Sequence, residues 1–397
     1  MTWTVGQTDA VGLRRRAALV GMVGACVVAG ACDPSRDPQG SSAGSTATTT
    51  ATMPPTSSTT APAGGLPDGF DVASVTFVSA TTGWALGTAP CGTGPCVQVW
   101  RTGDGGRTWT ARPAPPVAAP LEPGGGTAPI IRFANADDGW VSADGKLWST
   151  HDGGAHWAEQ PVGSVYALEA AAGIVHAVVA TRAQDMFAFG VTSSPVQRDD
   201  WRPSTTTVPH GAGPVPRAQL VLHGRAGWLV LVNRAVVGGL RLHQGRWESW
   251  KPPCDDDGAP VEVAASTASD LVAFCTDGVW NDRPAGERVL VSTDGGATFG
   301  LVASPLPVRV HAIAAATPGV WVAGGTEPGT AERPRSVLIR TADGGRTWTT
   351  VQHSPQANWV DLGFTTTAQG VVINEGERDR LLMTYDGGQT WRPVSAP

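Results

Sequence analysis

The stretch RTADGGRTWTT, from Arg340 to Thr350, decides the fold because it recurs with small changes along the chain. Asp tolerates tight-turn geometry and its carboxylate can accept backbone N–H bonds, while glycine allows positive φ. Each copy is therefore predicted to be a turn whose closing aromatic residue begins a strand and packs between sheets. The other copies are RTGDGGRTW ending at Trp109, STHDGGAHW at Trp157, VSTDGGATF at Phe299 and MTYDGGQTW at Trp391.

The spacing of the copies predicts a repeat. Their aspartates follow one another at intervals of 48, 142, 49 and 43 residues: Asp104, Asp152, Asp294, Asp343 and Asp386. The long interval has room for three units of about 47 residues, so two eroded copies are expected inside it. VQRDDWRP around Asp200 and HQGRWESW around Trp247 are the candidates.

Each unit reads as four short strands. Apolar runs introduced by Gly-Trp or a similar pair precede most copies, at Trp84, Trp140, Trp228 and Trp321, and alternating strands precede those runs. Seven such units predict an all-β fold, a seven-bladed β-propeller of four-stranded antiparallel blades. A linear solenoid is the alternative, but the chain lacks capping units.

Composition agrees with many short strands. The chain has 397 residues, 51 Gly, 32 Pro, 41% hydrophobic and only 16% charged residues, a mixture that disfavours long apolar helices. The net charge is −6, and the absence of clustered positive charge argues against a nucleic-acid-binding surface. No P-loop, nucleophile elbow, dinucleotide fingerprint or HExxH motif occurs, so neither a cofactor nor a metal is expected. An acidic turn at Asp255–Asp257 could bind calcium, but such turns are more often only solvated.

The N-terminus has the parts of an export signal. Arg14–Arg16 precede an uncharged run, Ala17–Ala31, and then Cys32. The segment before Cys32 resembles a bacterial lipobox, so residues 1–31 are predicted to be a lipoprotein signal peptide and Cys32 the lipidated residue. Cys26 is a competing site, and a plain secretory signal or an uncleaved anchor are further alternatives. Residues 32–66, rich in Ser, Thr, Pro and Ala, are predicted to be a flexible tether, and residues 67–397 the propeller. The expected location is the extracytoplasmic side of the cell membrane.

The remaining cysteines suit an exported chain. Cys91, Cys96, Cys254 and Cys275 form an even set, which predicts two disulfides with three connectivities open. A Cys91–Cys96 bond would close a B–C loop in the first unit, and a Cys254–Cys275 bond would tie unit four to unit five. The spacing in CGTGPC does not suit zinc.

The repeated segments resemble the Asp-box, or BNR, motif, Ser/Thr-x-Asp-x-Gly-x-Thr-Trp, from about Pro67 to Pro397. This motif occurs in sialidases, xyloglucan-cleaving enzymes, sortilin-type receptors and photosystem II assembly factors. The pairing of GWALG with RTxDGGxTW looks most like the assembly-factor-like group, which includes many bacterial exported proteins. The resemblance implies that the boxes lie at outer C–D turns, away from a central binding face. The five aspartates, together with Trp109, Trp157, Trp348 and Trp391, are then structural.

An enzyme reading finds little support. A sialidase-like mechanism implies a tyrosine nucleophile paired with glutamate and three arginines around a carboxylate. Tyr385 lies inside a box, which leaves Tyr166, and Glu169 three positions later faces the other side of a strand. Arg132 in IIRF is a poor match to the Arg-Ile-Pro signature and fits a structural salt bridge better. No catalytic residue is assigned. A non-catalytic binding or assembly scaffold is predicted, with an exo-α-sialidase-type glycoside hydrolase and a receptor-like ligand sensor as alternatives.

The B–C loops offer a candidate binding surface. Loops NDRPAGER, TEPGTAERPR and NEGERDR of units five to seven are long and charged, and a closed ring places them beside unit one. We hypothesise one mixed-charge surface for a protein or glycan partner at the cell envelope, on a chain expected to be monomeric. The alternative is that these tips only keep the protein soluble. The residues concerned are Arg283, Arg288, Arg333, Arg335, Glu377 and Arg378.

Overall fold

The computed structural model describes residues 65–394 apart from 93, 120, 122–127, 184–185, 212–214, 234, 255–260, 277–286, 307, 328–334, 356–357 and 376–380. These residues belong to one compact unit. They form strands and turns, and none of this described part is a helix long and apolar enough to cross a membrane. The predicted signal peptide, Cys32 and almost all of the predicted tether lie outside the described residues.

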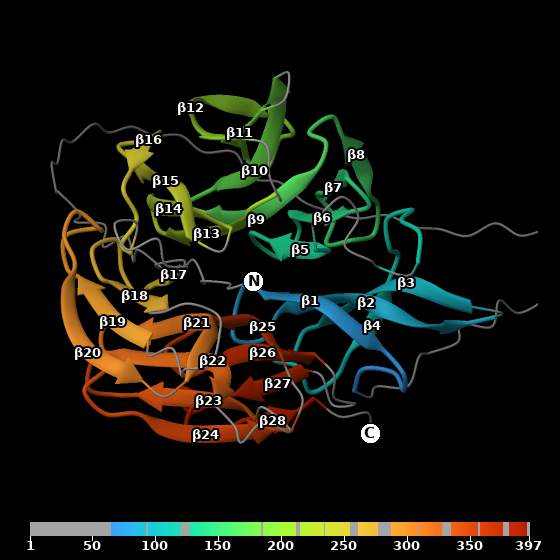
Figure 1. The fold of residues 1–397 in the computed structure, drawn as a ribbon. Coiled ribbons are helices and arrows are strands. Elements are labelled where there is room, and N and C mark those ends of the chain that lie inside the picture. Colours follow the sequence, from blue (N-terminus) through green and yellow to red (C-terminus); the bar gives the residue numbers. More distant parts are fainter. Residues whose placement is uncertain are drawn as a thin grey trace, which may run out of the picture. The chain divides into compact units, whose positions relative to one another are not determined.

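Seven four-stranded antiparallel sheets follow one another along the chain, which confirms the predicted seven-bladed propeller (Figure 1). Blade 1 consists of β1 (Asp71–Phe77), β2 (Gly83–Cys91), β3 (Gly94–Thr102) and β4 (Thr110–Arg112). Blade 2 consists of β5 (Ile130–Phe133), β6 (Gly139–Ala143), β7 (Lys146–Thr150) and β8 (Ala158–Gln160). Blade 3 consists of β9 (Val165–Ala171), β10 (Ile174–Ala183), β11 (Met186–Pro195) and β12 (Arg202–His210).

The other four blades repeat this order. Blade 4 consists of β13 (Arg217–His223), β14 (Ala226–Asn233), β15 (Ala235–His243) and β16 (Arg246–Trp250). Blade 5 consists of β17 (Val261–Ala265), β18 (Leu271–Thr276), β19 (Glu287–Ser292) and β20 (Gly300–Leu306). Blade 6 consists of β21 (Arg309–Thr317), β22 (Val320–Glu327), β23 (Arg335–Thr341) and β24 (Thr349–Ser354). Blade 7 consists of β25 (Asn358–Phe364), β26 (Gly370–Glu375), β27 (Leu381–Thr384) and β28 (Arg392–Pro393).

The eroded repeats are in the expected places. The segment around Asp200 joins β11 to β12, and the turn before Trp247 joins β15 to β16. Both are therefore third-to-fourth-strand turns that have lost the Asp-Gly-Gly sequence but kept the hairpin. Packing of the strands on their neighbours maintains the blade there without the box.

The antiparallel order separates two faces of the ring. The turns between the first and second strands and those between the third and fourth strands lie at the same ends of the sheets. This side, which carries the boxes, is called the box face. The opposite side, which carries the second-to-third-strand hairpins and the connections between blades, is called the loop face. The first strands of the blades line the centre of the ring, where neighbouring ones contact each other.

The hydrophobic core is divided among the blade junctions. Seven buried clusters occur, each shared by two neighbouring sheets. Trp84 of blade 1 stacks on Phe133 of blade 2 with ring centroids 3.7 Å apart. The glycine before Trp140 is required by packing, because a Cβ atom at Gly139 would lie 2.4 Å from the Phe133 ring. This explains why several second strands begin with a small residue followed by tryptophan.

The ring closes without a shared strand. All four strands of blade 1 come from the N-terminal part of the chain and all four strands of blade 7 from the C-terminal part. Val371 and Met383 of blade 7 pack with Phe77 and Trp109 of blade 1 in one buried cluster. In addition, the Tyr385 hydroxyl donates to the carbonyl oxygen of Gly105 at 2.6 Å. Side-chain contacts therefore hold the two ends of the ring together.

Candidate binding site

The carboxylate in the opening stretch holds a turn together. Asp343 accepts hydrogen bonds from the Thr347 amide at 2.9 Å, the Thr347 hydroxyl at 2.7 Å and the Thr341 hydroxyl at 2.8 Å. These bonds, from Thr347 first, lower the pKa of Asp343 to about 2. Arg346 donates to the Asp343 carbonyl oxygen at 3.1 Å. Both charged side chains are thus engaged within the turn itself.

The same pattern recurs in the other boxes, with one variation. Thr108, Thr298 and Thr390 donate to their box aspartates at 2.6 Å, while His156 takes this place beside Asp152. The closing tryptophan of three boxes donates to the second box glycine, as Trp348 does to Gly345 at 3.0 Å. The glycines need the left-handed region, with φ of 73° at Gly344 and 88° at Gly345.

The boxes also connect neighbouring blades. Trp84 of blade 1 donates to the Gly153 carbonyl oxygen in the box of blade 2, and Trp228 of blade 4 donates to Gly295 in the box of blade 5. Arg340 of blade 6 donates to Gly387 in the box of blade 7. The box is therefore a hydrogen-bonded turn whose glycine carbonyl groups accept side chains of the preceding blade.

We expect replacement of a box aspartate to reduce stability and not binding. In Asp104→Ala, the Thr102 and Thr108 hydroxyls and two backbone amides lose their acceptor. The free energy of unfolding should fall by about 1 to 2 kcal/mol, measured by denaturant titration. The matched control is Asp137→Ala, at an exposed aspartate on a turn of the same face, which should change it by less than about 0.5 kcal/mol. A stability loss in the control equal to that in Asp104→Ala would contradict this role.

A buried ion cluster lies at the centre of the ring. Arg132 on β5 is 3% exposed and donates from Nε to Glu169 of β9 and from Nη2 to Asp361 of β25, each at 2.8 Å. Its Nη1 atom donates to the Ser74 hydroxyl at 3.1 Å and to the Ile131 carbonyl oxygen at 2.8 Å. One guanidinium thus joins the first strands of blades 7, 1, 2 and 3.

A local irregularity places Asp361 in this cluster. The pairing of β25 with β26 shifts between Val360 and Gly363, and Asp361 has a φ of 50°. A bulge with one residue in the left-handed region redirects a side chain, and aspartate tolerates that conformation better than most residues. Asp361 consequently accepts hydrogen bonds from the Ser74 hydroxyl at 2.6 Å and the Val75 amide at 2.9 Å as well as from Arg132. It is a buried polar link across the seam between the chain's two ends, in addition to the Tyr385–Gly105 hydrogen bond.

Charge balance within the cluster calls for a proton. One guanidinium faces two buried carboxyl groups, and an uncompensated negative charge in the interior is unfavourable. Burial raises the pKa of Glu169 to about 8 although Arg132 opposes the change, whereas the two carboxyl groups raise the pKa of Arg132 against the effect of burial. Near neutral pH Glu169 is therefore protonated and accepts from the charged Arg132 guanidinium.

The structure does not bring together the tyrosine and glutamate of a sialidase-like pair. Tyr166 occupies a bulge in β9, and its ring packs edge-on against Phe189 with centroids 5.2 Å apart. Glu169 instead faces Arg132 in the cluster. The interpretation of Arg132 as an inner-strand arginine in a structural salt bridge agrees with this arrangement.

A cavity of about 540 Å³ opens on the loop face beside the central channel. Its wall is built from the starts of the first strands of blades 4 to 7 and from the ends of second strands in blades 4, 5 and 7. The lining residues are Val215, Arg217, Val232, Asn233, Val261, Glu262, Thr276, Arg309, Val310, His311, Asn358, Trp359, Val360 and Glu375. Ligand pockets commonly have volumes of about 300 to 1,000 Å³, so this cavity is large enough for a peptide side chain or a small ligand.

Polar groups in the cavity are held in fixed positions. Arg217 forms an ion pair with Glu262, and the Nε2 atom of His311 lies 2.8 Å from the Thr326 hydroxyl. Burial, with Arg309 and Arg217 adding to it, lowers the pKa of His311 to about 4, so this imidazole is neutral at physiological pH. Burial raises the pKa of Glu262, which Arg217 partly offsets. The cavity therefore combines charged, neutral polar and aliphatic groups.

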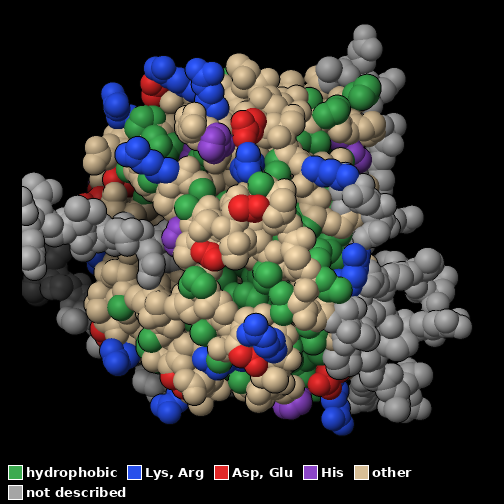
Figure 2. All heavy atoms as spheres, turned by 90° about the vertical axis from the view of Figure 1, so that its left-hand side faces the viewer, with side chains coloured by type: hydrophobic (Ala, Val, Ile, Leu, Met, Phe, Trp, Pro, Cys, Tyr) green, Lys and Arg blue, Asp and Glu red, His purple; other side chains and the backbone are tan. Residues whose placement is uncertain are grey.

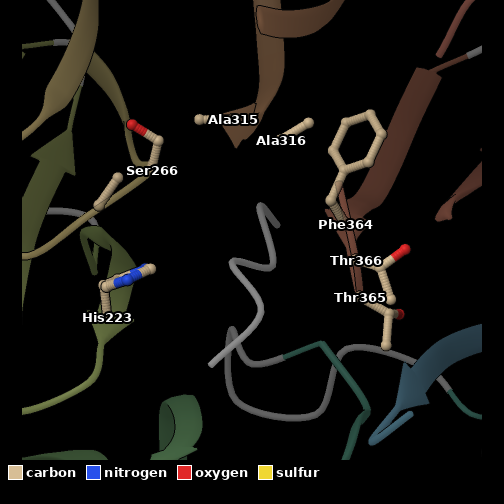
Figure 3. A pocket seen from close by; sticks show the side chains of 8 residues that line it. His223, Ser266, Ala315, Ala316, Phe364, Thr365 and Thr366 are labelled. Carbon is tan, nitrogen blue, oxygen red and sulfur yellow. The ribbon is translucent and has the colours of Figure 1, made fainter. Parts of the chain in front are cut away.

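The box-face end of the channel is much narrower. A cavity of about 20 Å³ lies there between the ends of the first strands of blades 4 to 7. In Figure 3, His223 and Ser266 lie opposite Phe364, Thr365 and Thr366. This volume suits about one water molecule, so the loop-face cavity is the better candidate for a binding site.

Surface charge is mixed on the side of the molecule shown in Figure 2. Acidic and basic side chains are interspersed there, and apolar side chains gather between them. Within the described residues, no group of three or more His, Cys, Asp or Glu side chains is arranged to hold a metal ion.

The predicted binding-surface residues are only partly within the described part. Arg288 lies in β19 and Arg335 begins β23, at the loop-face ends of blades 5 and 6. Arg283, Arg333, Glu377 and Arg378 lie outside the described residues, as do Asp255–Asp257. The mixed-charge surface therefore stays a prediction.

The cysteines pair in the way that the repeat suggested. Cys91 bonds Cys96 across the β2–β3 hairpin, and Cys254 bonds Cys275 of β18. The second bond joins the connection after blade 4 to blade 5, next to the cavity-lining residues Val261 and Thr276. It stabilises one wall of the loop-face cavity.

Comparison with known proteins identifies the fold and not the activity. No family model matches the sequence, and no curated protein is significantly similar to it. The solved structure "YCF48 bound to D1 peptide" is similar over 81% of this chain and 95% of that one, with a TM-score of 0.53 and 18% identity.

Two hydrolase structures are similar to a comparable degree. A puromycin hydrolase S511A mutant complexed with PGG matches over 84% of this chain and 54% of its own, at a TM-score of 0.52 and 12% identity. An acylaminoacyl peptidase in complex with Z-Gly-Gly-Phe-chloromethyl ketone matches over 82% of this chain and 52% of its own, at a TM-score of 0.52 and 8% identity. At identities this low, structural similarity establishes a shared propeller architecture and not a shared activity. The predicted resemblance to Asp-box proteins is therefore supported only as a resemblance of fold.

Sequence reasoning missed Asp361, Ser74 and the cavity. One signal was present: several first strands carry a single charged residue within an otherwise apolar run, as in IIRF, VYALEAA and NWVDLGF. Charged residues in buried strands are rarely found without a partner. That rule would have marked Arg132, Glu169 and Asp361 as residues in need of partners, without showing that they meet one another.

Proposed function

We propose that this protein is an exported, lipid-anchored β-propeller that acts as a non-catalytic binding scaffold at the cell surface and holds a segment of another protein in the loop-face cavity. The observation that carries this proposal is the cavity of about 540 Å³, lined by four successive blades on the face opposite the boxes. Its polar groups are preorganised by Arg217–Glu262 and His311–Thr326 contacts, which lowers the cost of binding.

A protein segment suits the cavity better than a glycan. Sugars commonly stack on exposed aromatic rings, but the lining Trp359 is fully buried. Extended peptides instead need a mixture of aliphatic surface and polar partners, which Val215, Asn233 and Asn358 offer. A propeller of similar fold has been solved with a peptide bound, which supports the same use of this architecture.

Photocrosslinking in the native cell envelope tests the proposal. The photoreactive amino acid p-benzoylphenylalanine is placed at Val215, at the cavity, or at Leu301, on the outer strand β20. Leu301 is 61% exposed and Val215 37%, so non-specific capture would favour Leu301. We expect Val215 to give at least about tenfold more of one polypeptide adduct.

A second variant tests the cavity directly. Asn358→Trp, at an exposed lining position, should fill the opening and remove the adduct without changing the melting temperature. Equal capture at both photoreactive positions, or capture that persists in Asn358→Trp, would refute cavity binding. Turnover of fluorogenic sialosides that is lost in Tyr166→Phe would instead establish the glycosidase alternative.

The lipid anchor is part of the proposal and rests on the sequence alone. Arg14–Arg16, the uncharged run and Cys32 support it. Incorporation of palmitate should be lost in Cys32→Ala and kept in Cys26→Ala; the reverse result would move the anchor to Cys26.

A further inference from the structure

The junction between blades 2 and 3 is held differently from four other junctions. At those four, a side chain donates to a glycine carbonyl oxygen in the next box: Trp84, Trp228, Arg340 and Tyr385. The corresponding turn of blade 3 is an eroded copy without the Gly-Gly pair. Its Asp199 takes over as the acceptor for donors on blade 2.

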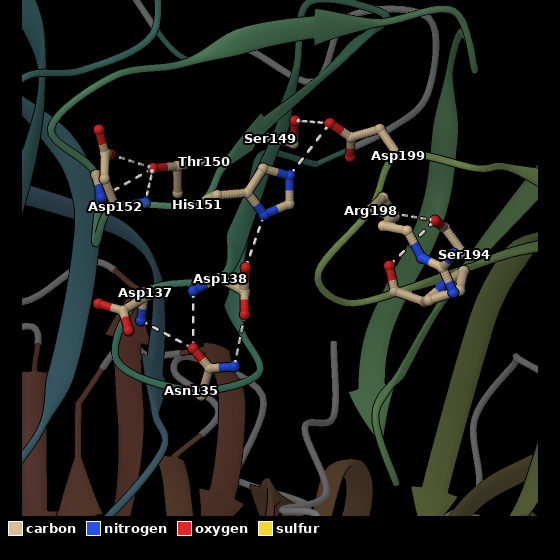
Figure 4. A network of polar contacts seen from close by, with 12 residues as sticks. Asn135, Asp137, Asp138, Ser149, Thr150, His151, Asp152, Ser194, Arg198 and Asp199 are labelled. Atoms are coloured by element: carbon tan, nitrogen blue, oxygen red, sulfur yellow. Dashed lines mark hydrogen bonds and ion pairs between the residues drawn. The ribbon is translucent and has the colours of Figure 1, made fainter.

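Asp199 collects three contacts from blade 2. Its Oδ2 atom lies 2.8 Å from the Ser149 hydroxyl, 2.9 Å from Nε2 of Gln160 and 3.3 Å from Nε2 of His151 (Figure 4). On the other side of the His151 ring, the Nδ1 atom lies 2.7 Å from Oδ1 of Asp138. The imidazole therefore lies between two carboxylates, one from its own blade and one from the next.

The protonation state of His151 decides how many of these contacts are hydrogen bonds. A neutral imidazole carries one N–H group and can donate to Asp138 or to Asp199, whereas the imidazolium donates to both. Asn135 donates to the second oxygen of Asp138 at 2.7 Å and so fixes that carboxylate in place. The contact with Asp138 is the shorter of the two, 2.7 Å against 3.3 Å, so loss of the proton weakens the contact with Asp199 first.

The surroundings of His151 are acidic on both sides. Partial burial opposes a charge, but Asp138 and Asp199 together raise the pKa of His151 above its ordinary value of 6.5. The other charged groups nearby are Asp152, which is bonded to His156 within its own box, and Arg198, next to Asp199 in the sequence.

We propose that His151 is a proton-operated latch between blades 2 and 3, closed when the imidazolium bridges Asp138 and Asp199 and loosened when the ring is neutral. A pKa raised in the folded state means that this stabilisation is complete below about pH 6.5 and is lost as the pH rises through the higher folded value. At the inner edge of the same junction, Arg132 bonds Glu169, whose pKa burial also raises. At both His151 and Glu169 the folded chain therefore holds a proton more tightly than the unfolded chain, so mild acid favours the folded state.

The consequence concerns how the ring opens. No strand is shared between blades in the described residues, so each junction depends on packing and side-chain contacts. Local opening in proteins starts where such contacts are weakest. Above the pKa of His151 we expect blades 2 and 3 to separate locally more often.

Hydrogen exchange of the full chain at pH 5.5 and pH 8 tests the latch, after correction for intrinsic exchange rates. In the unmodified chain, protection of β8 and of the β11–β12 turn should be higher at pH 5.5. Measured in a Glu169→Gln background, which removes the second titrating group at this junction, this pH-dependent gain should be about fivefold smaller in His151→Gln. The matched control is His243→Gln, at an exposed histidine on β15, which should behave as the unmodified chain does.

An NMR titration of the histidine ring signals gives an independent readout. His151 should titrate with a midpoint above the ordinary histidine value of 6.5, and Asp199→Asn should lower the His151 midpoint without unfolding the chain. A His151 midpoint at or below 6.5, or an unchanged pH dependence of protection in His151→Gln, would overturn the proposal.

Discussion

Arg132→Met should lower the free energy of unfolding by about 3 to 5 kcal/mol. Among the described residues, the substitution removes the cation that forms ion pairs with the buried Glu169 and Asp361, and it also leaves Ser74 without one of its partners. Asp361 would keep its neutral donors, Ser74 and Val75, but a buried carboxyl group that has lost its compensating cation costs far more than removal of the whole ion pair does. Urea denaturation followed by tryptophan fluorescence measures the change.

Two comparisons separate the loss of charge compensation from the loss of packing. Lys146→Met breaks the exposed pair with Glu159 and should change stability by less than about 1 kcal/mol. The triple variant Arg132→Met, Glu169→Gln, Asp361→Asn removes both carboxyl groups and should recover part of the stability. If the single variant fails to fold, the triple variant still tests the argument, and failure of both to fold would show that the shape of Arg132, rather than its charge, is essential.

Glu169→Gln should change the pH dependence of stability. Because the folded pKa of Glu169 is about 8 and its ordinary value 4.5, the stabilisation from holding this proton is present below pH 4.5 and lost as the pH rises towards 8. Glutamine retains a carbonyl oxygen that accepts from Nε of Arg132, and it does not titrate. The variant should therefore be about as stable as the unmodified chain at pH 5 and more stable at pH 9. The difference in the free energy of unfolding between the two chains should change by about 3 kcal/mol over this range.

Denaturation at several pH values between 5 and 9 measures this difference. The contribution of His151 is common to both chains and cancels. The control Glu159→Gln, at a half-exposed surface pair, should change the free energy of unfolding by less than about 1 kcal/mol at each pH. A flat difference for Glu169→Gln would mean that Glu169 is ionised in the folded protein at neutral pH.

The repeat was accessible from the sequence because its information is local. Each box encodes its own turn: Asp343 bonds groups at most four residues away, and the glycines that follow it need only their own φ. Seven local patterns with a common spacing then leave few ways to bury their apolar strands. The sequence also predicted two disulfides, but it left three connectivities open, and the structure pairs Cys91 with Cys96 and Cys254 with Cys275.

The central cluster and the cavity could not be read from the sequence in the same way. Arg132 and Asp361 are 229 residues apart, and their contact depends on ring closure and on a bulge that turns Asp361 inward. The loop-face cavity likewise arises from four blades whose strand ends converge at one side of the channel. No local sequence pattern marks a contact between residues so far apart in the chain, and none marks the bulge.

Blade 3, whose box is eroded, shows which features the sequence alone determines and which depend on the tertiary structure. The sequence alone determined that a unit is present there. The hairpin survives without the box because its strands still pack on both sides. Only the tertiary structure decided what replaced the missing glycine carbonyl groups, namely Asp199 facing His151, Ser149 and Gln160 of the neighbouring blade. Turn chemistry acts over a few residues and is written in the sequence, whereas contacts between blades are set by the geometry of the closed ring.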